Sequence, residues 1–216
     1  METRKANDPC DPVTCKVEKG DHEEEMSPYS APEPYFPPGQ LQAIAYEDLH
    51  PYLQGLQDEH GELKVEIEAF EATLDAIVKE GPSEVHDHGL RRFFHYIETT
   101  LIPHNRKEEK ALFPLLRQRL IAVGEHSPST TKVTAVEVLN DDHLEFLQLA
   151  AVMTNFFRIA PTLADSGAQQ QVLGAAIHQG RKLIESLKLH IFREDEVVFI
   201  LAASLVTAAE FDAMAQ

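Results

Sequence analysis

The sequence predicts an all-α protein, an up-down-up-down four-helix bundle preceded by a flexible N-terminal tail. From residue 41 onward, apolar residues recur at spacings of three and four, which is the period of an amphipathic helix. Proline and glycine divide this region into four long segments, and no segment alternates polar and apolar residues over the length of a strand. Four long amphipathic helices with connections of moderate length favour a four-helix bundle.

Residues 1–40 differ in composition and are expected to form a separate tail. They hold 7 of the 13 prolines and an acidic cluster at residues 21–25. Proline lacks a backbone N–H and fixes φ, so this stretch is unsuited to a packed helix. We therefore divide the chain into an acidic, Pro-rich tail (1–40) and a helical domain (41–216). Cys10 and Cys15 lie in the tail and are most simply two free thiols.

The helices of the domain are expected between residues that typically start or end a helix. Their expected ranges are 51–80, 83–120, 129–160 and 168–203, followed by a short helix at 208–215. Pro51, Gly81-Pro82-Ser83 and Gly124 mark ends and starts, and Thr207-x-x-Glu210 has the pattern of a capping box. Pro103 lies inside the second helix, where the lost hydrogen bond predicts a kink or bulge that re-aims His104.

The charge and the apolar content of the chain argue against a nucleic-acid or membrane partner. The chain has 36 acidic and 19 basic residues, a net charge of −17, which repels a phosphate backbone and argues against a nucleic-acid partner. The longest apolar run, Val197 to Val206, is far shorter than the roughly 20 residues that span a bilayer. The first residues lack the apolar core of a secretory signal, and two cysteines cannot build a disulfide framework. We therefore expect a cytoplasmic protein without a nucleic-acid or membrane partner.

Each of the four helices carries one histidine within its apolar stripe. The first stripe runs from Leu53 to Ile77 through His60, and the second from Leu90 through His104 to Leu112 and Leu115. The third stripe is expected to hold Val133, Val136, His143, Leu147, Ala150 and Phe157, and the fourth runs from Leu173 through His190 to Leu201. A lone histidine of this kind is often a satisfied core residue, so the pattern of all four is what matters.

Two of the stripes also carry a glutamate one helical turn after the histidine, Glu108 after His104 and Glu194 after His190. Residues at i and i+4 share a helix face, so both side chains are expected to point into the bundle. A buried, unpaired carboxylate costs several kcal/mol or a large rise in pKa. A pair of divalent or trivalent cations would neutralise both carboxylates and accept the lone pairs of the histidines.

An internal repeat supports this interpretation. His104 to Leu115 and His190 to Leu201 share the frame H-x-x-x-E-[ED]-x-x-[LV]-F-x-L. Two helix hairpins, each with one histidine on its first helix and a His/Glu pair on its second, would bring together four histidines and two glutamates. The predicted ligand sets are His60 and His104 for one metal and His143 and His190 for the other, with Glu108 and Glu194 bridging both.

The donor types narrow the choice of metal. Imidazole with carboxylate suits Fe, Mn, Cu or Zn, whereas Mg and Ca prefer oxygen ligands. The lack of cysteine at the site argues against structural zinc and iron–sulfur clusters. A ferritin-like site needs two inward Glu-x-x-His motifs, and the only match, Glu47-x-x-His50, precedes the first long helix. His86, four residues before Leu90, is considered as an additional ligand or proton donor.

These motifs resemble those of the hemerythrin-like (HHE cation-binding) family over about residues 50–203. The resemblance rests on His60, on His104 to Pro114 (H-x-x-x-E-E, then Leu-Phe-Pro), on the Asp-Asp-His that ends at His143, and on the second motif at His190. It implies a non-haem di-iron centre, with two iron ions bridged by oxo or hydroxo, inside a four-helix bundle. Family roles include O₂ binding, nitric oxide or peroxide chemistry, iron or redox sensing, and iron–sulfur cluster repair.

The function expected from this resemblance is binding of, and reaction with, a small ligand (O₂, NO or H₂O₂) at a centre of four histidines and two glutamates. The H-x-x-x-H pair of the oxygen-carrying hemerythrins is absent. Alternatives are an oxygen, iron or redox sensor without turnover, a di-iron protein of iron–sulfur cluster repair, and an oxidative enzyme with an organic substrate. The repair branch has adjacent cysteines, whereas Cys10 and Cys15 are separated by four residues. The sequence does not identify the redox partner.

Overall fold

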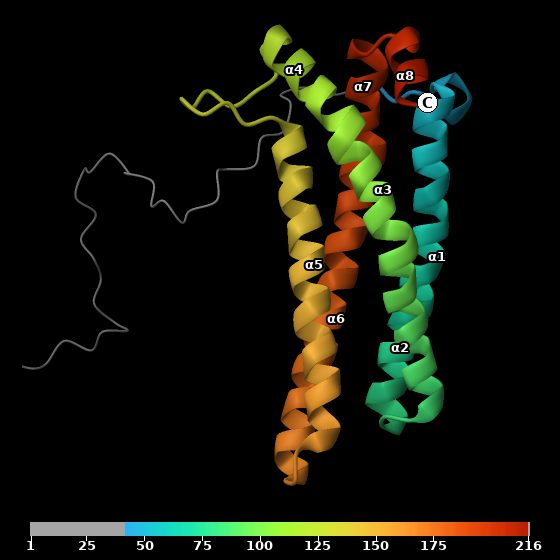
Figure 1. The fold of residues 1–216 in the computed structure, drawn as a ribbon, viewed down its shortest axis with the longest axis vertical. Helices are drawn as coiled ribbons and strands as arrows, with labels where there is room; N and C mark the ends of the chain where they lie inside the picture. The colour runs from blue at the N-terminus through green and yellow to red at the C-terminus, as the bar shows by residue number, and fades with distance from the viewer. Residues whose placement is uncertain (1–41, 216) are drawn as a thin grey trace, which may run out of the picture. The chain divides into compact units, whose positions relative to one another are not determined.

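A computed structural model describes residues 42–215, and every regular element in that range is a helix (Figure 1). The α-helices are α1 (Pro51–Glu80), α2 (Glu84–Tyr96), α3 (Ile102–Lys107), α4 (Phe113–Val123), α5 (Ala135–Ile159), α6 (Ser166–Arg193), α7 (Phe199–Leu205) and α8 (Ala208–Met214). Three π-helical turns, η2 (Ile97–Leu101), η3 (Glu108–Leu112) and η5 (Glu194–Val198), and two 3₁₀ turns, η1 (Tyr46–Asp48) and η4 (Ala160–Thr162), complete the set. The all-helical prediction is confirmed, whereas the predicted tail with its two cysteines lies outside the described residues.

The π-helical turns join shorter helices into long segments. The run from α2 through α4 is helical without interruption from residue 84 to residue 123, and the run from α6 through α7 from 166 to 205. α1 packs against α2, and α5 packs extensively against α6, so the chain forms two helix hairpins (Figure 1). Contacts of α6 with α1, and of α4 with α5 and α7, hold the hairpins together.

Local sequence signals account for most helix ends. Gly81 and Gly124 adopt positive φ (83° and 86°) directly after α1 and α4, where a residue with a Cβ would be strained. Thr207 and Glu210 form the predicted capping box of α8. The predicted start of the third long helix at residue 129 is wrong. α5 begins at Ala135, because Thr134 and Glu137 form a second capping box there.

The buried apolar residues form two clusters rather than one continuous core. One cluster includes Leu63, Phe70, Phe93, Leu101, Phe146 and Leu187, and the other includes Leu56, Leu112, Leu116, Leu139, Val198 and Phe199. Each long segment contributes to both clusters, so each crosses a layer that lies between them. The polar residues of the stripes fall in this layer.

Two stripes differ in register from the prediction. On α5 the buried residues after His143 are Phe146, Leu149 and Met153, while Leu147 is 47% exposed. The sequence was ambiguous here, because Phe146 and Leu147 satisfy the i+3 and i+4 spacings equally well. After η3, Leu116 is fully buried in place of the predicted Leu115, because a π-helical turn adds a residue and shifts the buried face.

No single helix among residues 42–215 is long and apolar enough to cross a membrane. In this described range, only the pair Ser166–Leu205 and Ala208–Met214, bent by 114°, reaches the required length and composition.

Candidate metal centre

The six polar residues singled out in the sequence lie together between the two hydrophobic clusters. They are His60 on α1, His104 on α3, Glu108 in η3, His143 on α5, His190 on α6 and Glu194 in η5. Each is between 0% and 4% exposed. The apolar packing above and below the layer therefore fixes the height at which each side chain enters the interior.

The donor atoms of these residues form two sets of four, which share both glutamates. The sets are His60, His104, Glu108 and Glu194, and Glu108, His143, His190 and Glu194. Within each set the donor atoms lie within 4.8 Å of one another. The Nε2 atoms of His60 and His104 are 3.2 Å apart, and those of His143 and His190 are 3.3 Å apart. The structure thus brings all six residues to one place.

Each histidine has a carboxylate on the outer side of its ring. The Nδ1 contacts are His60 to Asp195 (2.8 Å), His104 to Glu59 (2.6 Å), His143 to Glu109 (2.9 Å) and His190 to Asp142 (3.4 Å). An ionised carboxylate only accepts, so Nδ1 donates and the Nε2 lone pair of a neutral ring faces the centre. Two such lone pairs approach this closely only when a proton or a cation lies between them. Carboxylates in this position commonly accompany metal-binding histidines.

The four outer carboxylates were not predicted, although the sequence contains a signal for them. Glu109 and Asp195 directly follow the two glutamates of the repeat, and Glu59 and Asp142 directly precede the two lone histidines. An acid beside a histidine is unremarkable in a chain with 36 acidic residues. The pattern becomes informative only when the two hairpins are aligned and the acids recur at matching positions.

Glu194 contacts one histidine from each set through a single oxygen. Its Oε2 atom lies 3.0 Å from Nε2 of His60 and 3.2 Å from Nε2 of His190. These contacts are short but poorly aligned for hydrogen bonds, and neither oxygen has a hydrogen-bond partner in the described residues. Burial raises the pKa of Glu194, but the charges of His190 and His60 outweigh burial and hold that pKa well below its usual value.

Glu108 faces the two sets with its two oxygens. Oε1 lies 3.6 Å from Nε2 of His104, and Oε2 lies 3.6 Å from Nε2 of His143. Neither oxygen has a hydrogen-bond partner in the described part of the chain. Burial, and then the negative charge of Glu194, raise the pKa of Glu108 well above its usual value. Without a cation, a proton on the pair is therefore held preferentially by Glu108, and the negative charge by Glu194.

The donor set fits a pair of metal ions. Four buried carboxylate oxygens lack hydrogen bonds, and burying such groups unpaired costs several kcal/mol. Cations between the imidazole nitrogens and these oxygens would remove that cost. Nitrogen and oxygen donors without sulfur suit iron, manganese or zinc rather than magnesium or calcium.

Both glutamates stand at the first residue of a π-helical turn. η3 begins at Glu108 and η5 begins at Glu194. Pro114 follows η3 and Pro103 follows η2, so the missing N–H of proline favours a wider turn at these two places. η5 is followed by Ile200 at the matching position, so proline does not explain it. The feature common to η3 and η5 is the shared glutamate, in agreement with the frequent placement of π-turns at functional sites.

The stretch that carries this centre matches a known family. Residues 53–202 fit the sequence model of the hemerythrin HHE cation-binding domain. The chain belongs to the hemerythrin HHE family. A comparison with curated proteins finds no match. All six central residues and all four outer carboxylates of this HHE domain fall within the matched range.

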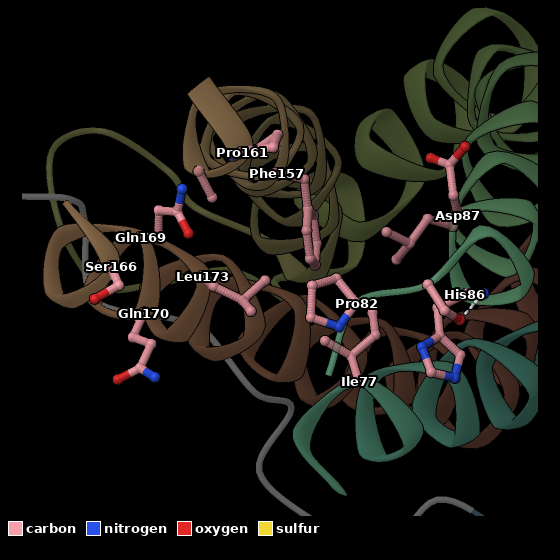
Figure 2. Close-up of a pocket in the computed structure, with 13 residues that line it drawn as sticks. Ile77, Pro82, His86, Asp87, Phe157, Pro161, Ser166, Gln169, Gln170 and Leu173 are labelled. Atoms are coloured by element: carbon pink, nitrogen blue, oxygen red, sulfur yellow. Dashed lines mark hydrogen bonds between the residues drawn. The ribbon is translucent and has the colours of Figure 1, made fainter. Parts of the chain in front are cut away.

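His86 lies away from the centre of the HHE domain. It is buried, and its Nδ1 atom is 2.9 Å from the carbonyl oxygen of Gly81. It lines a largely apolar hollow of about 550 Å³ together with Ile77, Phe157 and Leu173 (Figure 2). Ile77 follows His60 on α1 at a distance of about 25 Å along the helix. This hollow is therefore not part of the candidate centre.

A second hollow of about 580 Å³ lies beside η3. Its lining residues are Tyr52, Pro103, Arg106, Lys107, Lys110, Ala111, Met214 and Ala215. The Tyr52 hydroxyl is buried without a hydrogen-bond partner in the described residues. Burial, and then the nearby carboxyl groups of Glu108 and Glu59, raise the pKa of Tyr52 to about 12. Tyr52 is therefore a protonated phenol close to the centre, and it was not singled out in the sequence.

Proposed function

We propose that this HHE domain holds two iron ions and reacts with a small ligand, O₂, NO or H₂O₂. His60 and His104 would hold one ion, His143 and His190 the other, and Glu108 and Glu194 would be shared. The supporting observation is the set of four buried carboxylate oxygens without hydrogen bonds opposite four Nε2 atoms. Iron is the typical metal of the family. A bound pair of irons would supply open coordination positions and one-electron chemistry.

We also propose that the two hairpins form the up-down-up-down bundle of the family, as a domain that spans residues 41–216 and is separate from the tail. Sequential packing of α1 on α2 and of α5 on α6 supports this arrangement. Reduction of the irons requires an electron-donating partner. A nucleic-acid or membrane partner is not part of the proposal, given the net charge of −17.

The surroundings of the centre favour a small ligand over an organic substrate. Phe199 stacks on His60 with ring centroids 5.5 Å apart, and Phe113 stacks on His143 at 5.7 Å. Phe146 meets His190 edge-on at 4.9 Å. These rings exclude water beside the ligating nitrogens, and none of the six central residues lines either hollow described above. A diatomic molecule or peroxide fits such an enclosed site better than a larger substrate.

Metal analysis combined with rapid mixing tests the proposal. We expect about two irons per chain after anaerobic loading, and absorbance changes on mixing with O₂, NO or H₂O₂. Glu194→Gln should lose most of the iron, whereas Glu196→Gln, an exposed acid two residues along, should keep both ions. Equal iron content in the two variants would contradict the shared role of Glu194. Reversible O₂ binding without turnover of NO or H₂O₂ would instead indicate a sensor or binding module.

A further inference from the structure

The two halves of the centre have matching ligands but differ in the carboxylates behind the histidines. In the half formed by His60 and His104, both outer contacts are short. Oδ1 of Asp195 is 2.8 Å from Nδ1 of His60, and Oε2 of Glu59 is 2.6 Å from Nδ1 of His104. Each of these carboxylates binds a lysine with its other oxygen. Both acids are thus held in place while they accept from the histidine.

In the other half one outer contact is long and the other is to an exposed carboxylate. Oδ2 of Asp142 is 3.4 Å from Nδ1 of His190, near the limit for a hydrogen bond. Both oxygens of Asp142 are bound by Nη1 of Arg193, at 2.7 Å and 2.9 Å. Glu109 lies 2.9 Å from His143, but it is 41% exposed, and within residues 42–215 it pairs with no lysine or arginine.

The long contact between Asp142 and His190 follows from one methylene group. Glu59 and Asp142 occupy matching places in the repeat, and so do the cations Lys107 and Arg193, each directly before a shared glutamate. The longer Glu59 reaches Lys107 with one oxygen and its histidine with the other. Asp142 is shorter, and its contact with Arg193 leaves the contact with His190 long.

We propose that the two metal positions differ in affinity, so that the His143–His190 position fills second and exchanges first, and that Asp142 sets this difference. This inference rests on the proposed function. Outer carboxylates orient a ligating histidine and increase its basicity, and their loss typically costs 10- to 100-fold in metal affinity. The long contact at His190, together with the exposed carboxylate behind His143, predicts a difference of about 10-fold or more.

Titration of the metal-stripped full chain with Mn(II) tests the inference, because Mn(II) reports its own environment by electron paramagnetic resonance. At one equivalent we expect mainly the spectrum of isolated ions, followed by a weaker second phase with the spectrum of a coupled pair. A spectrum dominated by coupled pairs at one equivalent would overturn the inference while supporting the two-metal centre. Failure to bind any Mn(II) would overturn the metal centre itself.

Conservative exchanges of side-chain length assign the two phases. Asp142→Glu should tighten the second phase by about 10-fold and leave the first unchanged, while Glu59→Asp should weaken the first. Glu145→Asp is the matched control, because Glu145 lies on α5 but pairs with Lys182 and Ser186 on the surface. Unchanged affinities in both Asp142→Glu and Glu59→Asp, with unaltered circular dichroism, would overturn the role of Asp142.

Discussion

Glu108 and Glu194 each begin a π-helical turn, and each faces one histidine from both halves of the centre. Their electrostatic situations are nevertheless opposite. The pKa of Glu108 is raised by burial and by the charge of Glu194, whereas the pKa of Glu194 is lowered because nearby histidine charges outweigh burial. Two carboxylates that would be equivalent as shared ligands are therefore inequivalent without metal.

This contrast predicts different costs for the same substitution in the metal-free protein. Glu108→Gln should change the free energy of unfolding by less than about 1 kcal/mol, because a carboxyl that favours its protonated form is replaced by a neutral amide of similar shape. Glu194→Gln should lose about 3–5 kcal/mol, because it leaves buried histidine charges uncompensated. Urea unfolding at pH 7 with a chelator measures both. Equal losses would show that the two carboxylates share their charge evenly.

The stability of the metal-free protein should depend on pH in both directions. Burial lowers the pKa of His60, but contacts with Asp195 and Glu194 outweigh burial and raise it to about 9, against 6.5 when unfolded. Between these values the folded state binds more protons, so stability is lost as pH rises. Burial and the charge of His190 lower the pKa of His143 to about 4. Between pH 4 and 6.5 the unfolded state binds more protons, so stability is lost as pH falls.

Together, His60 and His143 are therefore expected to contribute most to the stability of the metal-free protein near pH 6.5. Stability thus falls on an alkaline limb above pH 6.5 and on an acidic limb below it. Since one pKa unit corresponds to about 1.4 kcal/mol, the free energy of unfolding lost on each limb is up to about 3 kcal/mol. Chemical unfolding over a pH series with a chelator measures the curve. His60→Gln should flatten the alkaline limb, and an alkaline limb of full size in that variant would assign it to another group.

The central residues were predictable because they break a strong pattern. A histidine or glutamate within an apolar stripe, as at His60 or Glu108, stands out against neighbours that all favour burial. The repeat then linked residues 86 positions apart without any knowledge of contacts. The helices themselves were predictable from the periodicity of apolar residues and from helix-ending residues such as Gly81 and Gly124.

Features that depend on neighbouring helices were not predictable in the same way. Asp142 and Glu109 lie beside the apolar stripes of their helices, where acids are common. Only tertiary packing brings them into contact with Nδ1 of a histidine on another helix. The π-turn at Glu194 has no proline to signal it. Leu147 and Phe146 are both compatible with the third stripe, and only the approach of α6 decides between them. The sequence therefore indicated the six residues of the candidate centre but not the groups that position them.

Two glycine substitutions test the packing between the hairpins. A Cβ at Gly180 on α6 would lie 2.8 Å from Cδ1 of Leu74 and 3.0 Å from Sδ of Met153, whereas a Cβ at the exposed Gly55 on α1 meets nothing within 4 Å. Gly180→Ala should therefore destabilise the protein by about 1–3 kcal/mol. Gly55→Ala should stabilise it by about 0.5–1 kcal/mol, because alanine favours a helix. Thermal unfolding compares the two, and a stabilised Gly180→Ala would mean that the close packing there relaxes easily.

Metal binding at pH 7 should release protons, because the empty centre holds more of them than the loaded one. Contacts with Asp195 and Glu194 overcome burial and raise the pKa of His60 to about 9, and Glu108 also has a raised pKa. A metal needs the neutral imidazole and the ionised carboxylate, so these protons must leave. We expect at least one proton per chain, measured by calorimetry of Mn(II) binding in buffers of different ionisation enthalpy. His60→Gln should lower the number by about one. A binding enthalpy independent of the buffer would mean that the empty centre is already deprotonated. The charges of Glu108 and Glu194 would then repel each other with no proton to reduce the repulsion.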